Sequence, residues 1–466
     1  MKNRSFSYTA ISITAFGARL LVTTLALLIA ITLFGCSSSI GNNDSDASKL
    51  PPIESGNNNT VCEENRNQEN NSSFVVADHI LEPVWMKSLG ESDGGSFGSV
   101  IQASDGSIVA VGSYRASGNS LPESKGGVDA FIAKFDNTGN LIWIKGFGSS
   151  DNDGFGSVVE SPDGGYVAVG CHIGVNGSRP KDGDLANLQG VGDAIIAKFD
   201  SNGNLVWVNN AGGTYSSFYK VILTDDGGFL ATGEAGGDGI IARFDSSGNL
   251  LWTKKYGGSR FDIFGSIVQT ADGNFVAVGS SDSSNGDVPG NNGDADAIVA
   301  KIDPNGDLIW MKNIGGDDLD QFCSVVQTAD GGVIAIGNSR SKNGDIPNNK
   351  GYFDAIIARF DSQGNLIWIK SIDGIGNEVL LEVALTLDGG FIAVGHTSSS
   401  SGDLLDSLTK HSVLFIKFDL QGTIEWIDTF FIDDGCEFGT VLQTTDGAFI
   451  AAGQSNNALI VCFEKT

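Results

Sequence analysis

The sequence predicts an all-β fold: a seven-bladed β-propeller with four antiparallel strands in each blade. Three observations lead to it. One short phrase recurs six times, a second phrase recurs seven times, and seven tryptophans stand at the same place in the repeat. The 466 residues include 64 glycines, which suits many short strands joined by tight turns. After residue 40, no stretch keeps the 3.6-residue period of an amphipathic helix.

The first phrase is a pair of apolar runs around a Gly-containing turn, and its second run ends in Trp. Its copies are AFIAKFDNTGNLIW (130–143), AIIAKFDSNGNLVW (194–207), GIIARFDSSGNLLW (239–252), AIVAKIDPNGDLIW (297–310), AIIARFDSQGNLIW (355–368) and VLFIKFDLQGTIEW (413–426). The second phrase surrounds an Asp-Gly turn, as in SVVQTADGGVIAIG (324–337). Gly, Asn and Asp accept the positive φ of hairpin turns, so each phrase predicts a hairpin. The second phrase supplies strands a and b of a blade, and the first supplies strands c and d.

All seven tryptophans fall in strand d, at Trp85, Trp143, Trp207, Trp252, Trp310, Trp368 and Trp426. Their spacing of 45 to 64 residues matches the period of a propeller blade. We expect each Trp to pack one blade against its neighbour. A ladder of Trp rings that stacks on sugars is the open alternative.

The two ends of the repeat array predict how the ring closes. PVWMKSLG, which contains Trp85, is a strand d with no strand c before it. ALIVCFEKT (458–466) is a strand c with no strand d after it. Pairing them would complete the seventh blade and remove two exposed strand edges, so residues 82–466 are predicted to form one closed propeller.

The repeats resemble known propeller families. An apolar strand b that ends in Gly, a strand c that ends in Asp and a Trp in strand d resemble kelch repeats, although the double glycine at the end of strand b is missing. FDSNGNLVW is similar to the repeat of quinoprotein-like propellers. The units are most similar to the DGG-type propeller repeats of bacterial secreted lipoproteins. That resemblance implies a propeller at the cell envelope and no particular activity.

The N-terminal segment predicts export and anchoring. Basic residues precede the 16-residue apolar run LLVTTLALLIAITLFG (20–35), which is shorter than the roughly 20 residues that span a bilayer. LFGC resembles a bacterial lipobox, with Phe34 as a departure from its pattern. The resemblance implies a signal peptide over residues 1–35 and acylation, such as palmitoylation, of Cys36. An uncleaved anchor and ordinary cleavage nearby are the alternatives. Residues 36–81, rich in Ser and Asn, are expected to be a disordered tether.

Net charge and loop positions narrow the function. A net charge of −28 disfavours nucleic-acid binding. Separately, we expect the protein to be a monomer. Strand direction places the b–c and d–a loops on one face. These loops are long and variable, so we expect a protein or glycan partner there. A non-enzymatic, membrane-anchored envelope platform is the favoured reading. A polysaccharide-active hydrolase or lyase and an envelope-assembly scaffold are the alternatives.

Four b–c loops share a Gly-Asp-apolar step, at Asp184, Asp287, Asp345 and Asp403. Calcium prefers carboxylate and carbonyl oxygens, so these aspartates are candidate Ca²⁺ ligands. Turn formation is the other use of such residues.

The sequence contains none of the common catalytic motifs and no cysteine pattern typical of a metal site or a disulfide framework. The four histidines form no HExxH motif, and no GxSxG nucleophile elbow stands out. The remaining cysteines, Cys62, Cys171, Cys323, Cys436 and Cys462, show neither CxxC spacing nor a disulfide framework.

Overall fold

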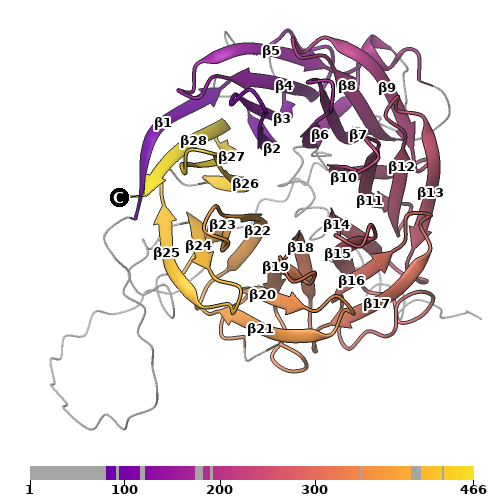
Figure 1. Cartoon of the computed structure of the whole chain (residues 1–466), viewed down its shortest axis with the longest axis vertical. Coiled ribbons are helices and arrows are strands. Elements are labelled where there is room, and N and C mark those ends of the chain that lie inside the picture. The colour runs from indigo at the N-terminus through magenta and orange to yellow at the C-terminus, as the bar shows by residue number, and fades with distance from the viewer. Residues whose placement is uncertain are drawn as a thin grey trace, which may run out of the picture.

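A computed structural model describes residues 80–90, 94–115, 121–173, 182–188, 193–346, 349–399, 411–432 and 435–465. These residues form seven four-stranded antiparallel sheets arranged as blades around a common axis (Figure 1). The predicted seven-bladed propeller is therefore confirmed. Cys36, Cys62 and Asp403 lie outside the described residues.

Each blade runs from an inner strand a to an outer strand d (Figure 1). Blade 1 contains β2 (Gly95–Gln102), β3 (Ile108–Tyr114), β4 (Asp129–Phe135) and β5 (Leu141–Phe147). Blade 2 contains β6 (Asn152–Glu160), β7 (Tyr166–Ile173), β8 (Ala194–Phe199) and β9 (Leu205–Ala211), with the short 3₁₀ turn η2 (Gly183–Leu185) between β7 and β8. Blade 3 contains β10 (Ser216–Leu223), β11 (Phe229–Ala235), β12 (Asp238–Phe244) and β13 (Leu250–Tyr256).

The later blades repeat this order. Blade 4 contains β14 (Asp262–Gln269), β15 (Phe275–Ser281), β16 (Asp296–Ile302) and β17 (Leu308–Ile314). Blade 5 contains β18 (Asp320–Gln327), β19 (Val333–Ser339), β20 (Asp354–Phe360) and β21 (Leu366–Ile372). Blade 6 contains β22 (Glu378–Leu385), β23 (Phe391–Thr397), β24 (Ser412–Phe418) and β25 (Ile424–Phe430). Blade 7 contains β26 (Glu437–Gln443), β27 (Phe449–Ser455), β28 (Asn457–Lys465) and β1 (Leu81–Leu89).

The last blade closes the ring as predicted. Strand β1 pairs antiparallel with β28, and Trp85 lies opposite Cys462 while Leu89 lies opposite Ala458. Figure 1 shows the two strands side by side although they come from opposite ends of the array. Closure pairs the edges that a linear array would expose.

The apolar core lies between the sheets. Strands b and c are buried on both faces, which explains their nearly continuous apolar sequence. The core clusters join neighbouring blades; in one of them Ile336 of blade 5 packs with Leu380 and Phe418 of blade 6. The described part of the chain contains no helix with the length and apolarity needed to cross a lipid bilayer.

Six of the tryptophans lie against the c–d turn of the following blade. The pairs are Trp85 with Gly139, Trp143 with Gly203, Trp207 with Gly248, Trp252 with Gly306, Trp310 with Gly364 and Trp368 with Gly422. Each of these glycines has φ between +72° and +83°, and a Cβ there would lie 2.6–3.0 Å from an indole atom. Trp426 instead packs on Phe449, with ring centroids 6.3 Å apart. Blade 7 offers it no c–d turn, because its c and d strands are β28 and β1.

The polar residues of the repeat hold its turns together. The Asp of the a–b turn pairs with the Lys or Arg of strand c; Lys134 Nζ, for example, lies 2.7 Å from Asp105 Oδ2. The hydrogen bond from Lys134 holds the pKa of Asp105 down at about 2. In the c–d turn, Asp136 accepts hydrogen bonds from the backbone N–H groups of Thr138 and Asn140 at 3.0 and 2.8 Å. These contacts explain the Asp residues of both repeated phrases as scaffold.

Candidate binding face

The b–c and d–a loops meet on one face of the ring and are joined by backbone hydrogen bonds. Asp320 N–H at the start of β18 donates to Ala295 O of the preceding blade at 2.7 Å, and Glu378 N–H donates to Phe353 O at 2.8 Å. The b–c loops of this face differ in length. Only Asn456 separates the b and c strands of blade 7, whereas residues 282–295 separate those of blade 4.

The Gly-Asp-apolar step fixes each long b–c loop to the neighbouring d–a loop. Asp287 N–H donates to Gly257 O at 2.9 Å, and Gly257 N–H donates back to Asp287 Oδ2 at 3.2 Å. Asp184 with Gly148, and Asp345 with Gly315, repeat this reciprocal pair. Asp184 also forms an ion pair with Lys125.

The residues on either side of these aspartates complete the step. Gly286 has φ +71°, and a Cβ at that position would overlap Gly257 O, so only glycine fits there. Val288 is buried beneath the loop. The three described aspartates thus use their carboxylates on backbone groups of separate loops, and the structure does not bring them together as one ligand set. Calcium binding by these residues stays a prediction.

A second set of acids, which the sequence analysis did not single out, lies buried where strand a begins. Its members are Asp153, Asp262, Asp320 and Glu378, all fully buried. Each accepts a hydrogen bond from the end of strand b in its own blade: Asp153 from His172, Asp262 from Ser281, Asp320 from Ser339 and Glu378 from Thr397. The sequence carries a weak signal for the set, an acid two residues before Phe or Leu at the start of strand a.

Burial raises the pKa of three of these acids, Asp262, Asp320 and Glu378. It raises the pKa of Asp320 to about 6 against the opposing hydrogen bonds from Ser339 and Ser341. It raises the pKa of Glu378 to about 7, and the nearby charge of Asp354 adds to the effect. The two groups are therefore partly protonated near neutral pH.

The central channel holds a small cavity of about 90 Å³, lined by the inner strands of all seven blades. Among the described residues of this lining, Glu382 of blade 6 is the one carboxylate, and its Oε1 lies 2.5 Å from Lys220 Nζ of blade 3. A glycosidase needs two convergent carboxylates. The described residues of the channel lining do not provide such a pair.

An exposed aromatic patch lies on the binding face between blades 5 and 6. We call Arg340, Tyr352 and Ile375 the Tyr352 patch. Tyr352 is 57% exposed and Ile375 is 74% exposed. Arg340 Cζ lies 4.5 Å from the centroid of the Tyr352 ring, and Tyr352 N–H donates to Gly376 O at 2.9 Å, which ties the two loops together. Arg340 itself is only 25% exposed, and its Nε lies 3.5 Å from Asp318 Oδ1. An exposed Tyr that packs on an Arg is typical of interface hot spots.

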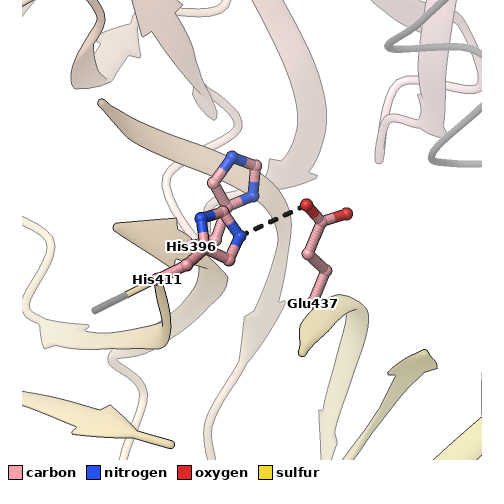
Figure 2. A group of neighbouring side chains, drawn as sticks. All are labelled: His396, His411 and Glu437. Carbon is pink, nitrogen blue, oxygen red and sulfur yellow. Dashed lines mark ion pairs between the residues drawn. The ribbon is translucent and has the colours of Figure 1, made fainter. Parts of the chain in front are cut away.

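A cluster of two histidines and a glutamate lies on the same face between blades 6 and 7 (Figure 2). His396 belongs to β23, His411 precedes β24, and Glu437 begins β26. His411 Nε2 lies 3.2 Å from Glu437 Oε1, and the two imidazole centroids are 4.9 Å apart. No sequence motif marks this cluster, because its three residues belong to different strands and have no fixed spacing.

The cluster residues differ in charge. Burial, together with the nearby His411, lowers the pKa of His396 to about 4 against the opposing charge of Glu437, so the His396 imidazole is neutral at pH 7. Burial opposes ionisation of Glu437, but the close contact with His411 and the presence of both imidazoles outweigh it and hold the pKa of Glu437 below its usual range. The site therefore offers a carboxylate and an uncharged imidazole.

Comparison with known proteins first identifies the class of the chain as a β-propeller. The WD40 β-propeller domain of Doa1 is 12% identical, with a TM-score of 0.50 over 83% of this chain and 97% of that domain. YCF48 from Cyanidioschyzon merolae is 11% identical, with a TM-score of 0.45 over 81% of this chain and 98% of YCF48. At such identities the likeness concerns the fold alone.

A more particular similarity comes from the sequence. Residues 128–350, slightly less than half of the chain, match the family model of the outer membrane protein assembly factor BamB. This agrees with the quinoprotein-like character of the repeat. No curated protein matches the chain.

Proposed function

We propose that this chain is a non-enzymatic binding platform at the bacterial cell envelope, and that the Tyr352 patch is the centre of its protein-binding surface. The observation that carries the proposal is that Tyr352 and Ile375 are exposed, with Arg340 packed on the Tyr352 ring, on a face whose described loops are joined by backbone hydrogen bonds. A rigid ring with exposed anchors loses little conformational entropy when it binds a partner.

The small size of the central channel favours a binding platform over a polysaccharide-active enzyme. Its cavity of about 90 Å³ is far smaller than the several hundred Å³ typical of ligand pockets. Its carboxylate is engaged in an ion pair with Lys220. The binding energy would therefore come from the loop face.

The envelope location rests on two sequence features. The first is the lipobox-like LFGC, from which we propose acylation of Cys36. The second is the similarity of residues 128–350 to an outer membrane assembly factor. A scaffold role in envelope assembly is the form of platform to which this similarity points.

The patch is tested by crosslinking and affinity capture from native envelopes with the full-length protein. Ile375→Asp should abolish recovery of the partner. Leu387→Asp, at a residue 66% exposed on the opposite face of blade 6, should leave recovery unchanged. Equal recovery with both variants would reject the patch, and binding of purified glycans that Ile375→Asp abolishes would reassign the partner as a polysaccharide.

Anchoring is tested separately. Cys36→Ala should abolish fatty-acid labelling and release or misprocess the protein. Labelling that persists in this variant would reject the lipoprotein proposal and leave the binding surface unaffected.

A further inference from the structure

The His396, His411 and Glu437 side chains lie next to one another between blades 6 and 7 (Figure 2). One ligand atom from each residue lies within 4.8 Å of the other two. The His411 side chain is 31% exposed and that of Glu437 is 21% exposed, so solvent reaches the cluster. His396 Nδ1 is buried and has no hydrogen-bond partner.

The scaffold itself does not require these residues, and the neighbouring blade borders show this directly. Strand register makes Asn338, Phe353 and Val379 the equivalents of the cluster at the border of blades 5 and 6. Phe353 and Val379 are buried in one apolar cluster there. At the border of blades 4 and 5 the equivalent residues are Ser280, Ala295 and Gln321.

Three polar side chains at this partly buried border must be stabilised by some interaction. Removing imidazole and carboxylate groups from water costs free energy unless they find partners. Phe353 and Val379 show that apolar side chains satisfy the same positions. A bound cation would supply the missing partner, because it would engage both imidazoles and the carboxylate together.

We propose that His396, His411 and Glu437 bind one divalent transition-metal ion of the zinc type. Imidazole nitrogen suits zinc and its neighbours in the first transition row, whereas calcium and magnesium prefer oxygen alone. Two imidazoles and one carboxylate leave the fourth tetrahedral position open for water or a partner's side chain.

The geometry requires only modest side-chain movement. Zinc ligands at about 2.0–2.1 Å from the metal lie about 3.3 Å from one another in a tetrahedron. His411 Nε2 and Glu437 Oε1 already have that separation, at 3.2 Å. His396 has to close the remaining distance. Gln454 Nε2 lies 3.5 Å from Glu437 Oε2 and would orient the carboxylate as an outer-shell partner.

The proposal is tested by titrating Zn²⁺ into chelator-treated full-length protein, with Co²⁺ absorption as the spectroscopic probe. We expect one saturable Zn²⁺ site and the intense visible bands of tetrahedral Co²⁺. His411→Ala and Glu437→Gln should each weaken Zn²⁺ binding by more than about 100-fold, because losing a ligand costs more than losing an outer-shell partner. Gln454→Ala should weaken it by about 10-fold.

His172→Asn is the matched control. His172 is a buried histidine of blade 2 whose Nδ1 lies 2.9 Å from Asp153, far from the cluster in the ring. This variant should bind Zn²⁺ like the wild type. Absence of a saturable site, equal competition by Ca²⁺, or full binding by the His396→Ala/His411→Ala variant would each overturn the proposal. Glu437→Gln changes few atoms and keeps the test valid if an alanine variant fails to fold.

Discussion

The border between blades 5 and 6 and the border between blades 6 and 7 use the same three scaffold positions in opposite ways. At the first, Phe353 and Val379 pack in an apolar cluster. At the second, His411 and Glu437 face each other at 3.2 Å, with His396 alongside. The backbone register is the same at both borders.

The two borders also differ in their buried acids. Asp354 and Glu378 start strands β20 and β22 at the first border, and both are fully buried. Ser412 and Cys436 take these positions at the second border and are buried as well. The carboxylate of the second border stands one residue later, at Glu437, where the neighbouring histidines can reach it. The repeat thus tolerates the exchange of apolar contacts at one border for a polar cluster at the next.

The largest expected difference is in core packing. Phe353→Ala should destabilise the protein by about 3 kcal/mol or more, because it removes a buried ring and leaves a cavity. His411→Ala should cost less than about 1 kcal/mol without metal, because this side chain is partly exposed. Chemical denaturation of both variants measures the contrast. Similar losses would mean that His411 also serves as core packing.

The next contrast concerns pH. The pKa of Glu378 lies near 7 when folded and near 4.5 when unfolded, so the folded state binds more protons between these values. The contribution of Glu378 to the free energy of unfolding is fully present below about pH 4.5 and is lost as pH rises through 7. The loss amounts to as much as roughly 3 kcal/mol.

Glu378→Gln should remove this part of the pH dependence, and Asp320→Asn should act in the same direction with a transition near pH 6. Unfolding curves from pH 4.5 to 8 provide the measurement. Glu464→Gln, at an exposed position, is the control and should change nothing. A slope that Glu378→Gln leaves intact would place the titration elsewhere.

Transferring the residues of the first border to the second tests whether the two borders are interchangeable. The expected change in stability is intermediate in size. The triple variant His396→Asn, His411→Phe and Glu437→Val carries the residues of the first border into the second. Replacing two of the three polar side chains of this partly buried cluster by apolar ones should stabilise the metal-free protein by about 1–3 kcal/mol. It should also abolish Zn²⁺ binding. If the variant is instead less stable in denaturation experiments, the two borders are not interchangeable.

The smallest expected change in stability concerns the loop aspartates, which we expect to hold turns and not to bind metal as proposed for the histidine cluster. Asp287→Ala removes the acceptor for Gly257 N–H and should cost about 1 kcal/mol. Asp294→Ala, an exposed acid of the same loop, should cost little. Thermal melts with Ca²⁺ or Mg²⁺ should show no metal-specific stabilisation. A Ca²⁺-specific rise in melting temperature that Asp287→Ala removes would establish the calcium site predicted from the loops.

Much of the architecture is determined by the sequence alone. Strand count, blade count and the joining of β1 to β28 follow from local signals: apolar runs of strand length, positive-φ turn residues and the phase of the repeat. Trp and Gly of the repeated phrase meet across blades in six copies, and the seventh Trp differs because its blade has no c–d turn. The Gly-Asp-apolar step was also visible as a repeated pattern, although sequence could not decide between a turn and a metal ligand.

The tertiary structure alone decided which side chains outside the repeated phrases meet between blades. His396, His411 and Glu437 come from two blades and have no fixed spacing, so no local pattern connects them. The buried acids at the start of strand a carry only a weak sequence signal, and the raised pKa values of Asp320 and Glu378 arise mainly from their burial in the folded ring. Contacts of this kind depend on ring closure and on the register between sheets, which are properties of the whole propeller and not of any segment of it.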